Sequence, residues 1–135
     1  MRLIASFLPH FMKQKETTVL VATSSLAFVP KAIFPTYCGT KAFLHSRVQS
    51  LRRQLRDVPV EVLELVPPYV RTELNGPSQA SDPRGMDVEE FVSEALGLLE
   101  ARDHAGGEVL VQRARLERQA ERDGIYDAIY GAANP

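Results

Sequence analysis

The sequence predicts an α/β fold organised around a small parallel sheet. Two runs rich in β-branched and apolar residues have the length of single strands, and we expect strands near residues 17–24 and 60–67. The residues between them, 37–56, instead repeat apolar side chains at helical spacing. Near-continuous apolar runs are typical of strands buried on both faces, as in parallel sheets. The order strand, helix, strand therefore indicates one βαβ unit.

The composition is that of an ordinary globular chain. Its 135 residues, which we treat as one domain (1–135), are 44% hydrophobic and 24% charged, with a net charge of -1. A net charge so close to zero gives no electrostatic reason to expect binding to nucleic acid or to an anionic membrane. No apolar run reaches the roughly 18 residues that a membrane span needs. The single cysteine, Cys38, excludes an intrachain disulfide and fits a reducing compartment, so we expect a cytoplasmic protein.

The first predicted element is an amphipathic helix over residues 2–13. Its apolar side chains fall on one helical stripe, which is formed by Leu3, Ile4, Phe7, Leu8, Phe11 and Met12. Pro9 lies inside the stretch and can kink it. The stripe indicates that this helix packs against another part of the molecule.

The residues after the second strand predict a loop, a helix, a short strand and a polar tail. The loop, 75–86, is rich in Gly, Pro, Ser and Asp. A helix is expected over 87–102, because Asp87 suits the N-cap position and two glutamates follow it in the first turn. Residues 108–112 predict a short strand, and residues 113–131 a polar helical tail.

A tyrosine and a lysine at helical spacing are the first sign of chemistry. Tyr37 and Lys41 are four residues apart, so both side chains project from the same helix face. A cation beside a phenol favours the phenolate, which makes the phenol useful as an acid or base. Ser24 ends the first predicted strand, at the sheet edge where α/β proteins bind ligands, so it can converge with the pair. Taken alone, the Tyr–Lys spacing is also common by chance on core helices.

The segment "VATSSLAFVPKAIFPTYCGTKAFLHS" resembles the active-site segment of the short-chain dehydrogenases/reductases. That family has a strand ending in Ser, a Tyr about 13 residues on, and a Lys four residues further, and Ser24, Tyr37 and Lys41 match all three positions. The next family signature is a strand ending in Pro-Gly and a short stretch closing on Thr. Here "VPPYVRT" takes its place, with Pro68 where the general pattern has Gly.

The resemblance implies a role for each matching residue in an NAD(P)-dependent oxidoreductase acting on a small carbonyl or alcohol substrate. Tyr37 would be the general acid/base. Lys41 would favour its phenolate and bind the nicotinamide ribose, and Ser24 would hold the substrate oxygen. The cofactor would be NAD or NADP. From the residues alone, Ser24 could equally form a strand-end turn.

The same resemblance implies that the cofactor contacts Pro67, Val70 and Thr72, besides Tyr37 and Lys41. Val70 and Thr72 would lie at the nicotinamide carboxamide or a nearby phosphate. Read without the resemblance, Val70 suits a core position and Thr72 a helix cap.

The glycine-rich turn of a dinucleotide-binding fold is missing from the sequence. The eight glycines are scattered, and only 16 residues precede Thr17. The resemblance therefore implies a partial Rossmann-like parallel sheet with flanking helices, lacking the N-terminal cofactor half. We expect a catalytic segment at 17–75, a variable C-terminal region at 76–135, and weak cofactor binding by this chain alone.

Three hypotheses on function follow. The first is an oxidoreductase that is active only when a longer product or a partner supplies the cofactor-binding elements. The second is a non-catalytic remnant that acts through helix-face association, with the helices at 2–13 and 37–56 forming a homo-oligomer contact. The third is an incomplete gene model with no independent role.

Overall fold

A computed structural model describes residues 2–135 and confirms the α/β fold with a three-stranded parallel sheet. The elements along the chain are α1 (Arg2–Phe11), β1 (Thr17–Ala22), η1 (Ser25–Ala27), α2 (Pro35–Gln54), β2 (Val60–Val66), α3 (Pro77–Ala80), α4 (Val88–Glu100), η2 (Ala105–Gly107), β3 (Glu108–Leu110), η3 (Gln112–Ala114), α5 (Arg115–Gln119) and α6 (Tyr126–Ala133). The predicted strands and the predicted helices at 2–13, 37–56 and 87–102 agree with the structure to within a few residues at each end.

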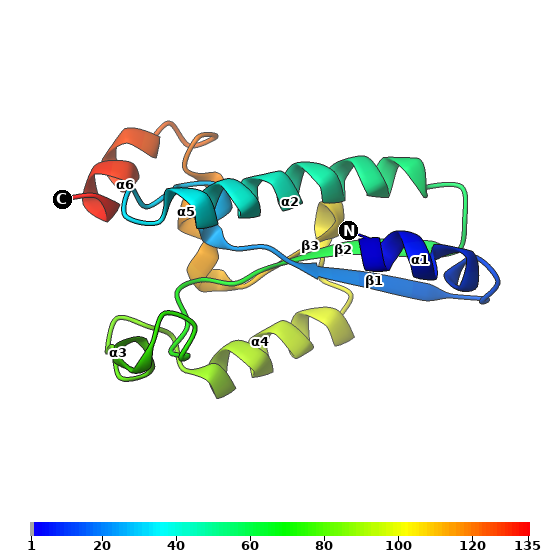
Figure 1. The fold of residues 1–135 in the computed structure, drawn as a ribbon, viewed down its shortest axis with the longest axis horizontal. Helices are drawn as coiled ribbons and strands as arrows, with labels where there is room; N and C mark the ends of the chain where they lie inside the picture. Colours follow the sequence, from blue (N-terminus) through cyan, green and yellow to red (C-terminus); the bar gives the residue numbers. More distant parts are fainter. Residues whose placement is uncertain (1) are drawn as a thin grey trace.

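The three strands lie in the order β1-β2-β3 and all run parallel, so β2 is the central strand. Thr17 pairs with Val60 at the start of the sheet, and Glu64 pairs with Glu108 near its other end. Figure 1 shows α2 along one face of the sheet and α4 along the other. Between them lies the carboxyl edge of the strands, where the chain turns into η1 after β1 and into the loop after β2.

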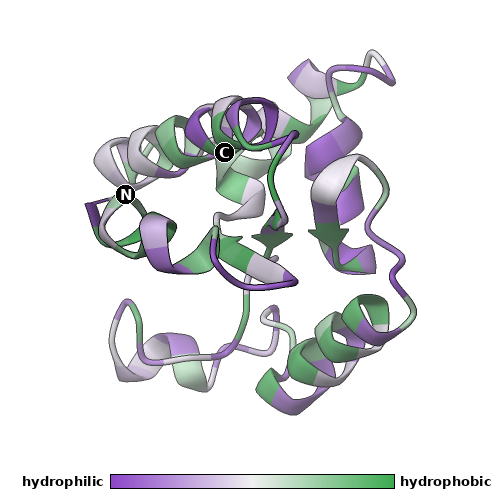
Figure 2. Ribbon diagram, turned by 90° about the vertical axis from the view of Figure 1, so that its right-hand side faces the viewer, coloured by the Kyte–Doolittle hydropathy of each residue, from purple (hydrophilic) through white to green (hydrophobic). Residues whose placement is uncertain are grey.

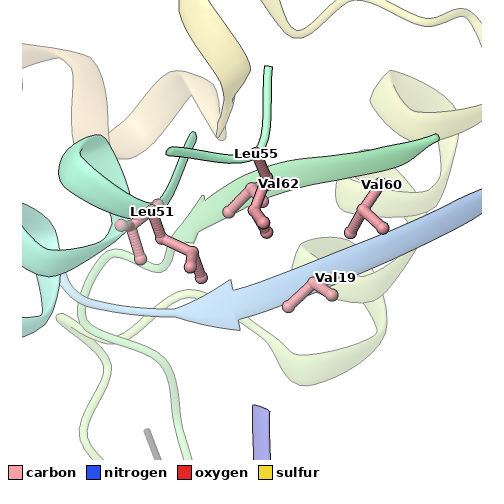
Figure 3. Close-up of a cluster of buried hydrophobic side chains, with 6 residues drawn as sticks. Val19, Leu51, Leu55, Val60 and Val62 are labelled. Atoms are coloured by element: carbon pink, nitrogen blue, oxygen red, sulfur yellow. The ribbon is translucent and has the colours of Figure 1, made fainter. Parts of the chain in front are cut away.

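Two apolar clusters hold these layers together. The first lies between the sheet and α2 (Figure 3) and consists of Val19, Val48, Leu51, Leu55, Val60 and Val62. One side of α1 packs onto this cluster through Ile4, Leu8 and Phe11. The other three residues of the predicted stripe, Leu3, Phe7 and Met12, are exposed. The second cluster lies under α4 and includes Met86, Ala95 and Val111. Each face of the sheet therefore has its own core.

The two predicted strands differ in how deeply they are buried. Of the seven residues of β2, five are buried, which agrees with a strand covered on both faces. In β1 only Val19 is buried, and Leu20 is 42% exposed. The composition of β1 suits a strand buried on both faces, and the expected partial sheet leaves it without a neighbour on one side among the described residues. Within residues 2–135, β1 is an edge strand paired only to β2. The strand arrowheads that are visible in Figure 2 are green, the colour of hydrophobic residues.

Helix α2 begins at Pro35 rather than at Tyr37. Proline is favoured at the first helical position, because its missing N–H is not needed there. Its buried residues include Val48 and Leu51, whereas Phe43 is 57% exposed. None of the helices within residues 2–135 combines the length and the apolar character that crossing a membrane requires.

The C-terminal region departs most from the prediction. Residues 113–131 were expected to form one helical tail, but the chain forms η3, α5 and α6 instead. Gly124, between the last two, has a φ of 69°, a backbone conformation that favours glycine and breaks a continuous helix. By contrast, α4 begins as predicted: the side chain of Asp87 accepts a hydrogen bond from the Glu89 N–H, and a second bond ties it to Arg71.

Candidate active site

The six residues predicted from the sequence line one cavity of about 460 Å³ at the carboxyl edge of the sheet. They are Ser24, Tyr37, Lys41, Pro67, Val70 and Thr72. The structure thus brings together all of them, from the ends of β1 and β2 and from the start of α2. Apolar side chains, including Phe34 and Phe91, also line the cavity. A mostly apolar cavity with a few converging polar groups is typical of small-molecule sites.

Ser24 lies just after β1, where the backbone is still extended. Its Oγ accepts a hydrogen bond of 3.2 Å from the Leu26 N–H, which caps the short helix η1. Ser24 is therefore a turn former as well as a cavity residue. Because a hydroxyl can accept and donate at once, its O–H hydrogen stays free to be donated to a ligand oxygen.

Lys41 lies beside Tyr37 on the first turns of α2, as their spacing predicts. Its Nζ is 5.5 Å from the centroid of the Tyr37 ring and donates a 3.1 Å hydrogen bond to the Ala22 carbonyl. This bond ties the helix to the end of β1. Partial burial lowers the pKa of Lys41 below its ordinary value of 10.5, because the charged form is poorly solvated.

The loop after β2 forms the third side of the cavity and is held by the buried amide of Gln79. Its Nε2 donates to the Val70 carbonyl at 2.8 Å and to the Thr72 Oγ1 at 3.2 Å. The same hydroxyl accepts from the Leu74 N–H, so Thr72 stabilises a local turn. The carbonyl of Pro67 accepts from the Ser25 N–H at 2.9 Å, which joins the two strand-end loops.

A buried carboxylate lies directly behind the cavity. Glu64, in the middle of β2, is completely buried. Thr23 Oγ1 donates to it at 2.7 Å, and His45 Nδ1 lies 2.8 Å from its Oε2. Thr23 precedes Ser24, and His45 follows Lys41 by one helical turn. Glu64 therefore links the end of β1, next to Ser24, with the helix that carries Tyr37 and Lys41.

This polar cluster continues to the C-terminal region. Arg118 donates two 2.7 Å hydrogen bonds to Glu108, and its guanidinium lies 4.7 Å from the centre of the Phe28 ring. The ligand atoms of His45, Glu64 and Glu108 lie within 4.8 Å of one another, a spacing that a metal ion could use. Because Arg118 already neutralises Glu108, we interpret these groups as a structural ion-pair network.

Glu64, His45 and Gln79 were not singled out from the sequence. Two of them left a signal there. Glu64 is one of two charged residues in a mostly apolar strand, and His45 continues the four-residue spacing of Tyr37 and Lys41. Gln79 lies in a polar loop, where nothing in the pattern distinguishes a buried amide from an exposed one.

Comparison with known proteins assigns the family. The family described as short chain dehydrogenase matches residues 1–83, and the chain therefore belongs to it. A curated relative, the "Uncharacterized oxidoreductase DltE" of Bacillus subtilis (strain 168), is 44% identical over 129 residues. The match covers 93% of this chain and 51% of the relative, so the chain spans about half the length of the curated relative.

Two solved structures share the fold. A short chain dehydrogenase from Burkholderia cenocepacia J2315 in complex with NADP superposes with a TM-score of 0.78 at 20% identity. A short-chain dehydrogenase from Sphingobium yanoikuyae in complex with NADPH gives a TM-score of 0.71 at 26% identity. Each match covers 97% of this chain, and 54% and 50% of the respective neighbour.

We predict that Glu64→Ala destabilises the protein strongly. It removes the acceptor for the Thr23 hydroxyl and the partner of His45 in a fully buried position. Removing one member of such a pair costs about 3–5 kcal/mol. The measurement is the free energy of unfolding in urea.

The matched control is Glu61→Ala, on the exposed side of the same strand, which should cost less than about 1 kcal/mol. Glu64→Gln keeps the shape and one acceptor, and we expect an intermediate loss. Equal stability of the Glu64 and Glu61 variants would show that the cluster contributes little.

Proposed function

We propose that this chain carries the carbonyl- or alcohol-binding half of an NAD(P)-dependent oxidoreductase. The observation that supports this most directly is the shared cavity, where Ser24, Tyr37 and Lys41 meet at the carboxyl edge of a parallel sheet. Membership of the short chain dehydrogenase family supports the reaction class. We expect the activity in the cytoplasm, where the single buried thiol of Cys38 would stay reduced.

The proposed reaction uses these three side chains in distinct roles. The hydroxyl of Ser24 donates a hydrogen bond to the substrate oxygen and orients it. In carbonyl reduction the Tyr37 hydroxyl donates its proton to that oxygen, and in alcohol oxidation the phenolate accepts the proton. The ammonium of Lys41, beside the ring, stabilises the negative charge that remains on Tyr37. The apolar side chains that line the same cavity limit the access of water to the reacting atoms.

A nicotinamide cofactor would supply or accept the hydride in this reaction. The residues present suit its nicotinamide and ribose end: Lys41 offers an ammonium donor for ribose hydroxyls, while Val70 and Thr72 offer a backbone and a hydroxyl along the same cavity. The glycines that would hold a pyrophosphate are absent from this sequence. The chain therefore suits one end of the cofactor only.

Tyr37→Phe should abolish carbonyl reduction in a chimera that adds the first half of a family relative to this chain. The substitution removes only the hydroxyl whose proton moves, and the loss should reach about 10²–10⁴-fold, the usual contribution of general acid/base catalysis. Turnover of simple ketones and aldehydes measures it. Wild-type turnover of the Phe variant would mean that the Tyr–Lys spacing is accidental.

In the same chimera Lys41→Met should reduce turnover and move the pH optimum upward, because the phenolate loses its neighbouring cation. Burial lowers the pKa of Lys41, so its ammonium loses the proton at a pH below 10.5. As the pH is raised, wild-type turnover should therefore begin to decline before pH 10.5 is reached. The Met variant should lack this particular decline. Ser24→Ala should lower the turnover rate more than the free energy of unfolding. Measuring the stability of this variant serves as the control for folding.

The chain alone should bind NAD(H) and NADP(H) weakly, with a dissociation constant above about 1 mM, because most phosphate contacts of the fold come from a glycine-rich turn. Calorimetric titration of the 135-residue protein measures this. Micromolar affinity would mean that the residues described here hold the whole cofactor.

A second candidate function is association through helix faces, and the exposed apolar residues of α1 and α2 favour it. Leu3 and Phe7 of α1 are 75% and 52% exposed, and Phe43 of α2 is 57% exposed. We propose that these helices form a homo-oligomer contact.

Phe7→Ser and Phe43→Ser should each weaken self-association by at least about tenfold. Burial of such a ring contributes about 1.5–3 kcal/mol, which corresponds to at least that factor in affinity. Sedimentation velocity over a concentration series gives the measurement. Ile33→Ser is the control, since Ile33 is 76% exposed but lies outside both helices. A monomeric wild-type protein at all concentrations would exclude this candidate.

A further inference from the structure

One carboxylate oxygen near the candidate active site has no use in the scheme above. Among the side chains of residues 2–135, Oε2 of Glu117 is the one buried nitrogen or oxygen atom without a hydrogen-bond partner. Leaving such an atom unsatisfied is costly, and native structures contain few of them. Glu117 lies on α5, more than ninety residues beyond Ser24 in the sequence, and it lines the same cavity as Ser24, Tyr37 and Lys41.

The lysines that line this cavity with Glu117 are engaged elsewhere, and so is its sequence neighbour Arg118. Lys41 donates to the Ala22 carbonyl, and the Nζ of Lys31 lies 5.6 Å from the centre of the Tyr69 ring. Arg118, the next residue along the chain, is bound to Glu108. Within the described residues, no lysine, arginine or histidine forms an ion pair with Glu117.

The backbone that carries Glu117 is held in place. Arg118 joins α5 to β3 through its two hydrogen bonds to Glu108. Its guanidinium also lies over the ring of Phe28, the residue that follows η1. The anchor and the unsatisfied carboxylate are consecutive residues of one short helix. Glu117, which lines the cavity, therefore sits on a fixed backbone, which is what a residue that orients a ligand needs.

We propose that Glu117 recognises the substrate, and that the substrate carries a hydrogen-bond donor, a hydroxyl or an ammonium group, besides its reacting carbonyl. A carboxylate can only accept hydrogen bonds, so its ligand must donate. This inference rests on the proposed function, because it assumes that the cavity holds a carbonyl or alcohol. It makes Glu117 a residue that determines specificity and leaves the proton transfer to Tyr37.

Three ketones of nearly equal size test the inference with the full 135-residue chain. They are 4-methylcyclohexanone, 4-hydroxycyclohexanone and 4-aminocyclohexanone, and their affinities are measured by NMR titration at neutral pH. The hydroxyl and ammonium ketones should bind about tenfold more tightly than the methyl ketone, since hydrogen bonds to charged groups are worth at least that factor.

Two variants then separate the two donors. Glu117→Leu should remove the preference for both ligands. Glu117→Gln keeps the shape of the side chain and an accepting oxygen, so it should retain part of the preference for the hydroxyl and lose that for the ammonium. Glu121→Gln is the matched control: Glu121 is exposed and does not line this cavity, so all affinities should stay unchanged.

The outcomes distinguish this inference from the proposed function. Equal affinity of the wild-type chain for all three ketones, or an unchanged preference in Glu117→Leu, overturns the role of Glu117 and leaves the carbonyl site standing. Binding of none of the three overturns both. The Gln variant keeps the test decisive if the Leu variant fails to fold.

Discussion

The buried carboxylate of Glu64 is the interaction on which the arrangement of the site depends. Taking an ionised group out of water is expensive, and only complete pairing makes it tolerable. Here Thr23 and His45 supply that pairing from β1 and α2, so the carboxylate of the central strand determines where both neighbours lie. Ser24 follows Thr23 in the sequence, and Lys41 lies one helical turn before His45. The positions of both therefore follow from this cluster.

Local patterns were enough to predict the elements that carry the site. The helical spacing of Tyr37 and Lys41 and the position of Ser24 at a strand end are properties of short segments, and both survive in the structure. Two contacts could not be predicted in this way. The pairing of Glu64 with His45 requires the packing of α2 on β2, and the presence of Glu117 in the cavity that Ser24 lines requires the path of the entire C-terminal region.

Burial and helix breaks also depend on more than local pattern. The apolar composition of residues 17–24 suits a strand buried on both faces, but burial depends on which elements cover it, and in the partial sheet β1 has a paired strand on one side only within residues 2–135. The predicted tail at 113–131 was read from its polar and charged residues, which suit a helix surface. Gly124 interrupts it through a backbone conformation that such a pattern does not reveal.

The parallel sheet also has a consequence for how the chain folds. Thr17 pairs with Val60, and Glu64 with Glu108, so each strand pairing joins residues more than 40 positions apart, and the sheet contains no hairpin. Loops of this length must close before the pairing contributes any stability, which raises the contact order and slows folding. During that interval α2 and α4 can form by themselves, while the apolar strands remain exposed. Aggregation is then a competing reaction, and dilute, cool conditions should favour recovery of the native protein.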